Sequence, residues 1–392
     1  MSESNHLMKT YAPLDVCFER GEGAYLFDDK GAQYLDALTG IAVCGLGHVH
    51  PAVTKAIQDQ AEKLIHTSNL YCIQNQQQLA DKLCKISGMD NVFFSNSGAE
   101  ANEVAIKLAR LYGNQQNIEK PSIIVTDGSF HGRTLATLSA TGNRKVHAGF
   151  EPLVQGFTRA PYNDIDAIKA IAQNSSNTVA ILVEPIQGEG GINLPDENYL
   201  TQLRAICDEH NWLLMLDEIQ TGMARTGKWF AFQHSNIVPD VMTLAKGLGN
   251  GVPIGACLAH GKAAELFQPG NHGSTFGGNP LASAAASAVI DTISKDHLCQ
   301  RADELGKKML SGFEAQLKNL PEIKSIRGIG LMIGIELNRD CSELVKQALE
   351  KNCLINVTAG SVVRLLPPLI LSNEQADTIV NLVSQLIKDF IK

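Results

Sequence analysis

The sequence has little charge for its length and no block of charge of one sign. Charged residues make up 19% of the 392 residues, the formal net charge is −8, and no cluster of lysine and arginine stands out. Proteins that bind nucleic acid neutralise its phosphates with clustered cations. The composition therefore argues against nucleic acid as a partner.

Paired cysteines and metal-ligand clusters are also missing. The nine cysteines are scattered and include no pair separated by two residues. A disulfide framework or a zinc site would need an even, regularly spaced set, so we expect reduced thiols in a reducing compartment. His48 and His50 alternate, but no third ligand lies near them in the sequence, so we expect no metal.

Neither a secretion signal nor a membrane span is evident. Residues 1–5 contain no basic segment, and no apolar core follows them. The longest apolar stretches, such as residues 281–290, are too short and too rich in alanine and serine to cross a bilayer. We therefore expect a cytoplasmic protein that makes no membrane contact.

What the sequence does contain is a regular alternation of short apolar runs and helical patterns. Strands are predicted at residues 92–95, 123–126, 179–184, 213–216, 241–245 and 254–259. Helices are predicted at residues 100–112, where Gly113 would end the helix, and at 197–210. This alternation predicts an α/β fold with a mainly parallel central sheet that is covered by helices on both faces.

The two ends of the chain have a different sequence pattern from the central part. Residues 23–38 alternate and are punctuated by glycine, which predicts a small β-meander. Beyond Pro280 an alanine-rich helix, a helix at 305–317 and strands near 323–337 are predicted. We expect residues 1–45 and 281–392 to form a smaller α+β domain, and residues 46–280 to form the large domain.

Lys246 and Asp217 each end an apolar strand, 29 positions apart. Burying such charges is costly without a partner, and ligands of open α/β sheets bind outside these strand ends. A lysine that forms a Schiff base to pyridoxal phosphate, with an acid facing the ring nitrogen, would use such a pair. Taken alone, the pair fits a surface lysine and a helix-capping aspartate equally well.

Two loops could hold a phosphate. Ser97 and Gly98 join a strand to a helix, where a hydroxyl and free N–H groups meet the positive end of the helix dipole. The commoner alternative is a plain helix cap, with Glu100 completing a capping box. Ser274 and Thr275 lie in a glycine-rich loop and could reach the phosphate of a neighbouring subunit. The alternative there is a loop that simply starts a helix at a proline.

Other side chains could hold a flat ring and carboxylates. Phe130 could stack on a ring, and Arg133 could grip a carboxylate with two N–H groups. Gln220 could hydrogen-bond a ring oxygen, and Glu189 could pair with a substrate-binding arginine. Arg364 lies in an apolar run and needs an anionic partner. A core phenylalanine, a surface arginine, a solvated turn and a structural ion pair are the alternatives.

Together and in this order, these residues resemble the class III (ornithine-type) aminotransferases, which are fold-type I pyridoxal-phosphate enzymes. The resemblance extends almost from end to end, from residues 20–28 to residues 363–368. It is carried by the runs at residues 40–43, 95–102, 130–134 and 222–228. The resemblance implies pyridoxal 5'-phosphate as cofactor and a homodimer with active sites at the interface.

The resemblance also implies a role for each matching residue at the cofactor. Lys246 would form the Schiff base and then move the proton, while Asp217 would face the pyridine nitrogen and Gln220 the ring oxygen. Glu218 and Ile219 belong to the same cofactor-binding segment, and Phe130 would stack on the ring. The residues implied to hold the phosphate are Ser97, Gly98, Ala99 and the partner subunit's Thr275.

For the substrate, the resemblance implies transfer of the δ-amino group of N2-acetyl-L-ornithine to 2-oxoglutarate. Arg133 and the partner subunit's Ser274 would bind the acylated end. Arg364 would take the 2-oxoglutarate α-carboxylate, and Glu189 would neutralise Arg364 when the amine is bound. Ile41 stands where ornithine-specific members have tyrosine, which suits an acylated amine. Succinylornithine, N-succinyl-diaminopimelate, 4-aminobutyrate and a racemase or isomerase activity stay open.

Overall fold

The computed structural model describes residues 6–392 of the chain. Residues 1–5, which enter the expectation that no secretion signal is present, lie outside the described residues. Within the described part, no helix combines the length and the apolar character that crossing a membrane requires.

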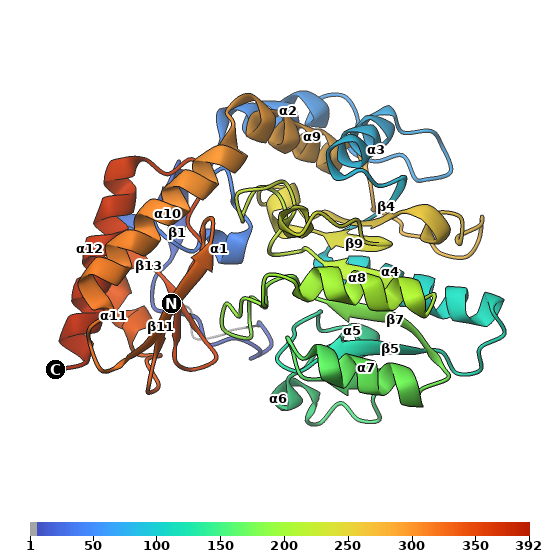
Figure 1. Ribbon diagram of the computed structural model, residues 1–392. Helices are drawn as coiled ribbons and strands as arrows, with labels where there is room; N and C mark the ends of the chain where they lie inside the picture. Colours follow the sequence, from blue (N-terminus) through green and yellow to red (C-terminus); the bar gives the residue numbers. More distant parts are fainter. Residues whose placement is uncertain (1–5) are drawn as a thin grey trace.

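A seven-stranded sheet forms the centre of the larger part of the molecule (Figure 1). Its order is β4 (Asn91–Ser95), β10 (Gly255–Ala259), β9 (Val241–Leu244), β8 (Leu213–Asp217), β7 (Thr178–Val183), β5 (Ser122–Thr126) and β6 (Phe157–Ala160). Within this sheet, β10 runs antiparallel to its two neighbours, and the other pairs are parallel. The predicted mainly parallel sheet is therefore confirmed. Strand β6 was not predicted, because it is a short edge strand with only one fully buried residue.

Helices cover this sheet because its central strands are apolar on both faces. Every residue of β5, β7, β8 and β9 is buried, as expected for parallel strands between two helical layers. The surrounding helices are α3 (Gln74–Ser87), α4 (Gly98–Gln115), α5 (Leu135–Ala140), α6 (Arg144–His147), α7 (Ile165–Asn174) and α8 (Tyr199–Glu209). The parallel order brings the carboxyl ends of β5, β7, β8 and β9 to one edge of the sheet.

The prediction that Gly113 ends its helix is wrong, because α4 continues to Gln115. Gly113 is buried within the helix, and a Cβ atom there would lie 2.6 Å from Pro121 Cβ and 2.7 Å from Val179 Cγ1. The glycine thus permits close packing of α4 against neighbouring segments. It does not terminate the helix.

Both ends of the chain build the smaller part, on the left in Figure 1. Its first sheet has the order β1 (Phe18–Glu22), β2 (Tyr25–Asp28), β3 (Gln33–Asp36) and β13 (Cys353–Leu354), and its second has β11 (Ile323–Ile329), β12 (Met332–Leu337), β15 (Val362–Leu365) and β14 (Asn356–Thr358). Its helices are α10 (Leu298–Leu317), α11 (Leu344–Glu350) and α12 (Asn373–Phe390). The parallel pairing of β3 with β13 joins the two ends. This confirms the expected small α+β unit.

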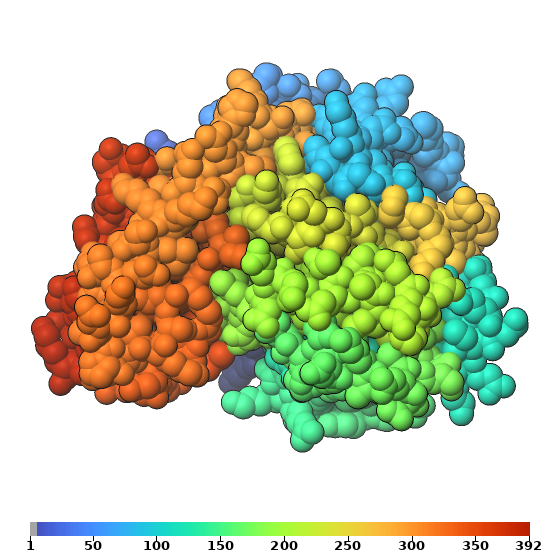
Figure 2. Space-filling model, viewed as in Figure 1, coloured from blue at the N-terminus to red at the C-terminus, as the bar shows by residue number. Residues whose placement is uncertain are grey.

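Helix α9 (Pro280–Lys295) leads from one part of the molecule to the other. It packs against α2 (Pro51–Ala61) and α3, at the top of Figure 1, and α10 follows it into the smaller part. In Figure 2 the orange and red C-terminal residues fill one side of the molecule and the green and yellow central residues the other. We retain the domain boundaries at 45/46 and 280/281 as a proposal.

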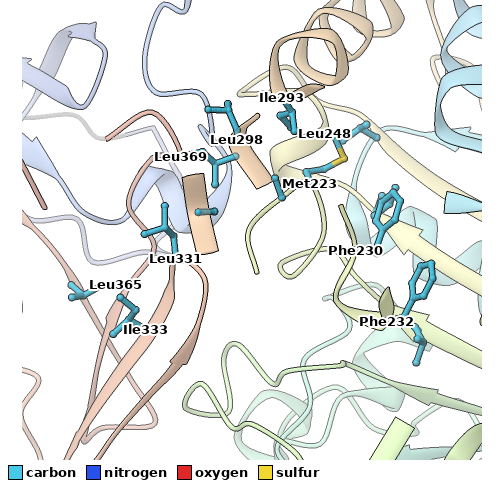
Figure 3. Packing of buried hydrophobic residues seen from close by; sticks show 14 of the residues in the cluster. Met223, Phe230, Phe232, Leu248, Ile293, Leu298, Leu331, Ile333, Leu365 and Leu369 are labelled. Carbon is cyan, nitrogen blue, oxygen red and sulfur yellow. The ribbon is translucent and has the colours of Figure 1, made fainter. Parts of the chain in front are cut away.

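One apolar cluster continues through both parts. Figure 3 shows it between Leu331, Leu365 and Leu369 on one side and Met223 and Leu248 on the other. Beside it, buried Arg225 donates through Nη1 to the carbonyl oxygens of Leu331 (3.1 Å) and Pro367 (2.5 Å). Burial lowers the pKa of this arginine to about 10. These contacts fix the loop after β8 to the smaller part.

A buried histidine-carboxylate pair in the N-terminal segment predicts a pH-dependent stability. His48 Nε2 lies 2.8 Å from Asp36 Oδ2, and the two side chains are 15% and 2% exposed. Burial disfavours the charged imidazole, but the hydrogen bonds to Asp36 and Cys44 outweigh this and raise its pKa to about 9. The folded-state pKa therefore lies above the ordinary value of 6.5, so the stabilisation is complete below about pH 6.5 and is lost as the pH rises through about 9.

We expect His48→Gln to lower the free energy of unfolding by about 1–3 kcal/mol at pH 6, the range for a hydrogen bond to a charged group. Because the wild-type histidine is neutral above its raised pKa, the difference should shrink towards pH 10. Urea unfolding across this pH range measures it, with exposed His6→Gln as the control. A difference that does not change with pH would contradict the assignment.

Candidate active site

A cavity of about 410 Å³ lies at the carboxyl edge of the large sheet. It is lined by most of the residues predicted from the sequence, namely Ser97, Gly98, Ala99, Phe130, Arg133, Glu189, Asp217, Ile219, Gln220 and Lys246. Segments that are far apart in the chain therefore meet around one space.

Lys246 follows β9 closely and is held in an unusual conformation. Its φ angle is 44°, a left-handed value that residues other than glycine rarely adopt. Such strain accumulates at functional sites. Burial lowers the pKa of its amino group, Glu189 opposes that shift, and nearby Arg364 adds to it. A lysine with a lowered pKa is a better nucleophile, since more of it is the free amine.

Asp217 ends β8 and is surrounded by donors. Its Oδ2 accepts from Asn102 Nδ2 and faces His131 Nδ1, both at 2.8 Å, and its Oδ1 accepts from the backbone N–H of Ile219 at 3.1 Å. A carboxylate accepts all three bonds, and His131 then donates from Nδ1. The buried Nε2 of His131 has no hydrogen-bond partner among residues 6–392.

The residues that hold Asp217 were not predicted from the sequence. Asn102 Oδ1 accepts from Thr243 Oγ1 at 2.8 Å, and Asn102 Nδ2 also donates to the carbonyl of His131 at 2.8 Å. Two features of the sequence could have pointed to Asn102 and His131. Asn102 lies four positions after Gly98 and hence on the same helical face, and His131 adjoins Phe130.

The loop predicted to hold a phosphate has the structure of a helix cap. Ser97 is the N-cap of α4 and accepts from the N–H of Glu100 at 3.2 Å. Glu100 in turn accepts from the backbone N–H of Asn96 at 2.6 Å. A Cβ atom on Gly98 would lie 2.7 Å from Ile219 Cδ1, so a larger residue here would displace the Ile219 side chain. The cap thus leaves the start of α4 facing the cavity.

Glu184, another residue that was not predicted from the sequence, ties two cavity loops together. Its Oε2 accepts from the N–H of Phe130 at 3.0 Å, and its Oε1 accepts from the N–H of Gly188 at 3.2 Å. Burial, with a further contribution from nearby Asp217, raises its pKa to about 7. Glu184 therefore sets the position of the Phe130 ring and of the loop that carries Glu189.

Gln220 and Glu218 face different surroundings. The Oε1 atom of Gln220 is buried at the cavity and has no hydrogen-bond partner in the described part of the chain. Glu218 does not line the cavity, because its carboxylate accepts from the Thr221 hydroxyl and from the N–H groups of Ala231 (2.9 Å) and Phe232 (2.8 Å). Its side chain thus holds the loop that follows.

The predicted substrate contacts are only partly assembled within one chain. Arg133 is exposed at the cavity, with its guanidinium carbon 5.7 Å from the centre of the Phe130 ring. Ser274 and Thr275 do not line this cavity. The Ser274 hydroxyl instead accepts from Asn96 Nδ2 at 3.3 Å, and Thr275 is exposed.

Arg364 has the anionic partner that its apolar surroundings require. It is 1% exposed, and its Nη1 donates to Glu189 Oε1 at 2.7 Å. Glu189 lines the cavity and is 35% exposed. This pair therefore lies between the interior of the smaller part and the cavity.

Ile41 lies in the short helical segment α1 (Thr39–Ala42). Several residues of this segment have positive φ angles, that of Ile41 being 67°. Ile41 packs in an apolar cluster with Leu38 and Leu194, while the adjacent Val43 lines the cavity. Ile41 itself does not line the cavity, so Val43 provides the apolar contact from this part of the chain.

The residues present fit pyridoxal phosphate. The start of α4 offers N–H groups to a phosphate, Asp217 offers a carboxylate, and Gln220 brings to the cavity an amide whose NH2 group can donate to a ring oxygen. The buried amine of Lys246 completes the set. Among residues 6–392, no group of three His, Cys, Asp or Glu side chains is placed to hold a metal ion.

Comparison with known proteins gives the same result. The family described as "Aminotransferase class-III" matches residues 7–387. An acetylornithine aminotransferase of Nitrosomonas europaea is 58% identical over 388 residues, which cover 99% of each chain. One of Aquifex aeolicus is 49% identical and covers 97% of this chain and 100% of its own length.

Solved structures agree with these matches. The ornithine aminotransferase of Toxoplasma gondii has a TM-score of 0.95 at 34% identity, covering 98% of this chain and 93% of that chain. An acetylornithine aminotransferase of Elizabethkingia anophelis has a TM-score of 0.88 at 36% identity, covering 98% and 97%. The chain belongs to the class III aminotransferases and, like them, uses pyridoxal phosphate.

Proposed function

We propose that this protein transfers the δ-amino group of N2-acetyl-L-ornithine to 2-oxoglutarate, giving N-acetyl-L-glutamate 5-semialdehyde and L-glutamate, as in arginine biosynthesis. The observation that carries this proposal is the Glu189–Arg364 pair beside the buried amine of Lys246. An enzyme that accepts both a monocarboxylic amine and a dicarboxylic oxo acid needs a cation that can be neutralised in turn. The names of full-length relatives support the substrate.

Bound pyridoxal phosphate supplies an electron sink for the carbon that bears the reacting nitrogen. We propose that Lys246 would attach the cofactor until the substrate's amino group displaces it, and that the freed Nζ would then take the proton from that carbon and deliver it to the cofactor's C4′. Asp217, held by Asn102 and His131, keeps the ring nitrogen protonated. Gln220 would donate to the ring oxygen.

The remaining cofactor contacts orient the ring. In our proposal the Ser97 hydroxyl and the N–H groups of Gly98 and Ala99 hold the phosphate, at the positive end of α4. Phe130 covers one face of the ring, and Ile219 contributes an apolar contact from the cavity wall. For Glu218 we propose a structural role, since its carboxylate is fully used by the neighbouring loop.

For the amine substrate we propose that Arg133 binds the α-carboxylate of the acylated end, because its charge is exposed at the cavity. Val43 forms an apolar side of the cavity next to Ile41, and neither side chain offers an acceptor to a free α-amino group. Arg364 would bind the α-carboxylate of 2-oxoglutarate once Glu189 moves aside. When the amine is bound, Glu189 returns and neutralises Arg364.

We further propose a cytoplasmic homodimer. The partner subunit's Ser274 and the partner subunit's Thr275 would complete the carboxylate and phosphate sites, since neither residue reaches the cavity of its own chain. Large apolar side chains at Leu70 (86% exposed), Tyr71 (68%) and Phe276 (59%) offer a surface for such an interface. The free cysteines fit a reducing compartment.

The test of the substrate is a panel of amino donors with 2-oxoglutarate as acceptor. We expect kcat/KM to be highest for acetylornithine, with succinylornithine next. Ornithine should be poorer by roughly tenfold or more, because its charged α-amino group would be desolvated against the apolar side. A clear preference for 4-aminobutyrate would overturn the assignment.

A further inference from the structure

A single amide holds the guanidinium of Arg364 from the side away from Glu189. Asn356 Oδ1 accepts from Arg364 Nε at 3.1 Å and from Nη2 at 2.7 Å. The two residues lie directly opposite each other on the neighbouring strands β14 and β15. Cross-strand register therefore fixes this contact as part of the sheet.

Apart from its bond to Arg364, the other partner, Glu189, is held through its backbone within residues 6–392. The carbonyl of Glu189 accepts from Thr358 Oγ1 at 2.5 Å, and two further carbonyls of its loop, of Gly191 and Ile192, accept from Arg327 at 2.6 and 2.8 Å. The Glu189 side chain is 35% exposed, whereas that of Arg364 is 1% exposed. Exchange of partners at Arg364 can thus occur by rotation of the Glu189 side chain, with the loop in place.

A guanidinium offers five N–H donors in a rigid plane. Asn356 occupies the edge formed by Nε and Nη2, and Glu189 uses Nη1. An incoming carboxylate therefore has the end formed by Nη1 and Nη2, once Glu189 leaves. Because the fixed partner is a neutral amide, the full positive charge of Arg364 is then available to that carboxylate.

We propose that Asn356 is a positioning residue for the oxo-acid half of the reaction, and that its neutrality keeps the Glu189–Arg364 switch reversible. This inference rests on the proposed function of Arg364 as the site for the 2-oxoglutarate carboxylate. Asn356 itself touches neither substrate nor cofactor in this scheme. It fixes the plane of the guanidinium and leaves its charge to a mobile partner.

Asn356→Asp tests the proposal, because it places a permanent carboxylate where the amide lies without changing the size of the side chain. Two half-reactions of the holoenzyme are followed separately through the cofactor's absorbance, one with acetylornithine and one with 2-oxoglutarate. Binding of glutarate, a dicarboxylate that cannot accept an amino group, is measured by calorimetry. The control is Asn338→Asp, which adds the same charge at an exposed position after β12.

We expect Asn356→Asp to weaken glutarate binding and to raise the KM for 2-oxoglutarate by roughly tenfold or more, as for loss of a charge-assisted hydrogen bond. The acetylornithine half-reaction should stay close to the wild-type rate. The double variant of Glu189→Gln and Asn356→Asp gives a further test, through the rate of the acetylornithine half-reaction. Glu189→Gln alone should slow the acetylornithine half-reaction, because Arg364 is then not neutralised, and Asn356→Asp should restore it.

Equal losses in both half-reactions, unchanged glutarate binding or no rescue of Glu189→Gln would each overturn the proposal. If Asn356→Asp does not fold, Asn356→Ala decides, since it removes the acceptor without adding charge. It should weaken glutarate binding several-fold and leave the acetylornithine half-reaction unchanged; unchanged glutarate binding would overturn the proposal. Failure of the wild-type protein to use acetylornithine would instead overturn the proposed function, whatever Asn356 does.

Discussion

Replacing Lys246 by alanine is expected to lower turnover by at least about a thousandfold, since positioned proton transfer alone contributes roughly 10²–10⁴-fold. The substitution removes the amine that we propose both attaches the cofactor and acts as the base at the reacting carbon. Its burial and lowered pKa make this amine the one suited to both tasks. Among residues 6–392, no other lysine lines the cavity.

The measurement has two readouts. Borohydride treatment followed by peptide mass analysis should find the cofactor fixed to Lys246 in the wild-type protein and to no lysine in Lys246→Ala. Steady-state turnover should collapse in the same variant. Exposed Lys295→Ala is the control and should behave as wild type. Turnover near the wild-type value in Lys246→Ala would contradict the assignment.

Asp217→Asn is expected to keep the cofactor bound and to lose activity by roughly 10²–10³-fold, the range for removing one preorganised electrostatic partner. The phosphate and stacking contacts proposed for Ser97, Gly98 and Phe130 do not depend on this carboxylate. An amide at position 217 is neutral, and its NH2 group would face either the donors of Asn102 and His131 or the backbone N–H of Ile219. The ring nitrogen would then no longer be held protonated.

Cofactor content from absorbance, set against kcat, separates binding from chemistry in this variant. Asp208→Asn is the control, because Asp208 is exposed and forms a surface ion pair with Arg204. We expect it to change neither quantity. Normal turnover in Asp217→Asn, or loss of activity only in proportion to lost cofactor, would contradict the proposed role of Asp217.

The parts of the site that follow from chain direction could be predicted from the sequence. Lys246 and Asp217 end apolar runs, and parallel strands bring such ends to one edge, so their meeting was foreseeable. Gly98 starts a helix directly after a strand, and this pattern is typical of a phosphate-binding site. The pairing of Glu189 with Arg364 was suggested by resemblance, since nothing in a single sequence links residues 175 positions apart.

The supporting hydrogen bonds could not be predicted in this way. Asn102 reaches both Asp217 and Thr243 because of the angle at which α4 crosses the sheet. That angle is set by packing between distant segments and is not visible in the local sequence. Gly113 appeared to be a helix end because local signals do not reveal a neighbouring segment that needs space. Asn356 gave no signal, since its role depends on strand register across a turn.

Transfer of an amino group between two substrates at one site is tested most directly by a single half-turnover. The wild-type holoenzyme is mixed with acetylornithine and no oxo acid. We predict one aldehyde released per active site, a cofactor absorbance that changes and then stops, and release of glutamate only when 2-oxoglutarate is added. Recovery of unchanged acetylornithine with no aldehyde, and no glutamate after 2-oxoglutarate is added, would contradict amino transfer as the reaction of this site.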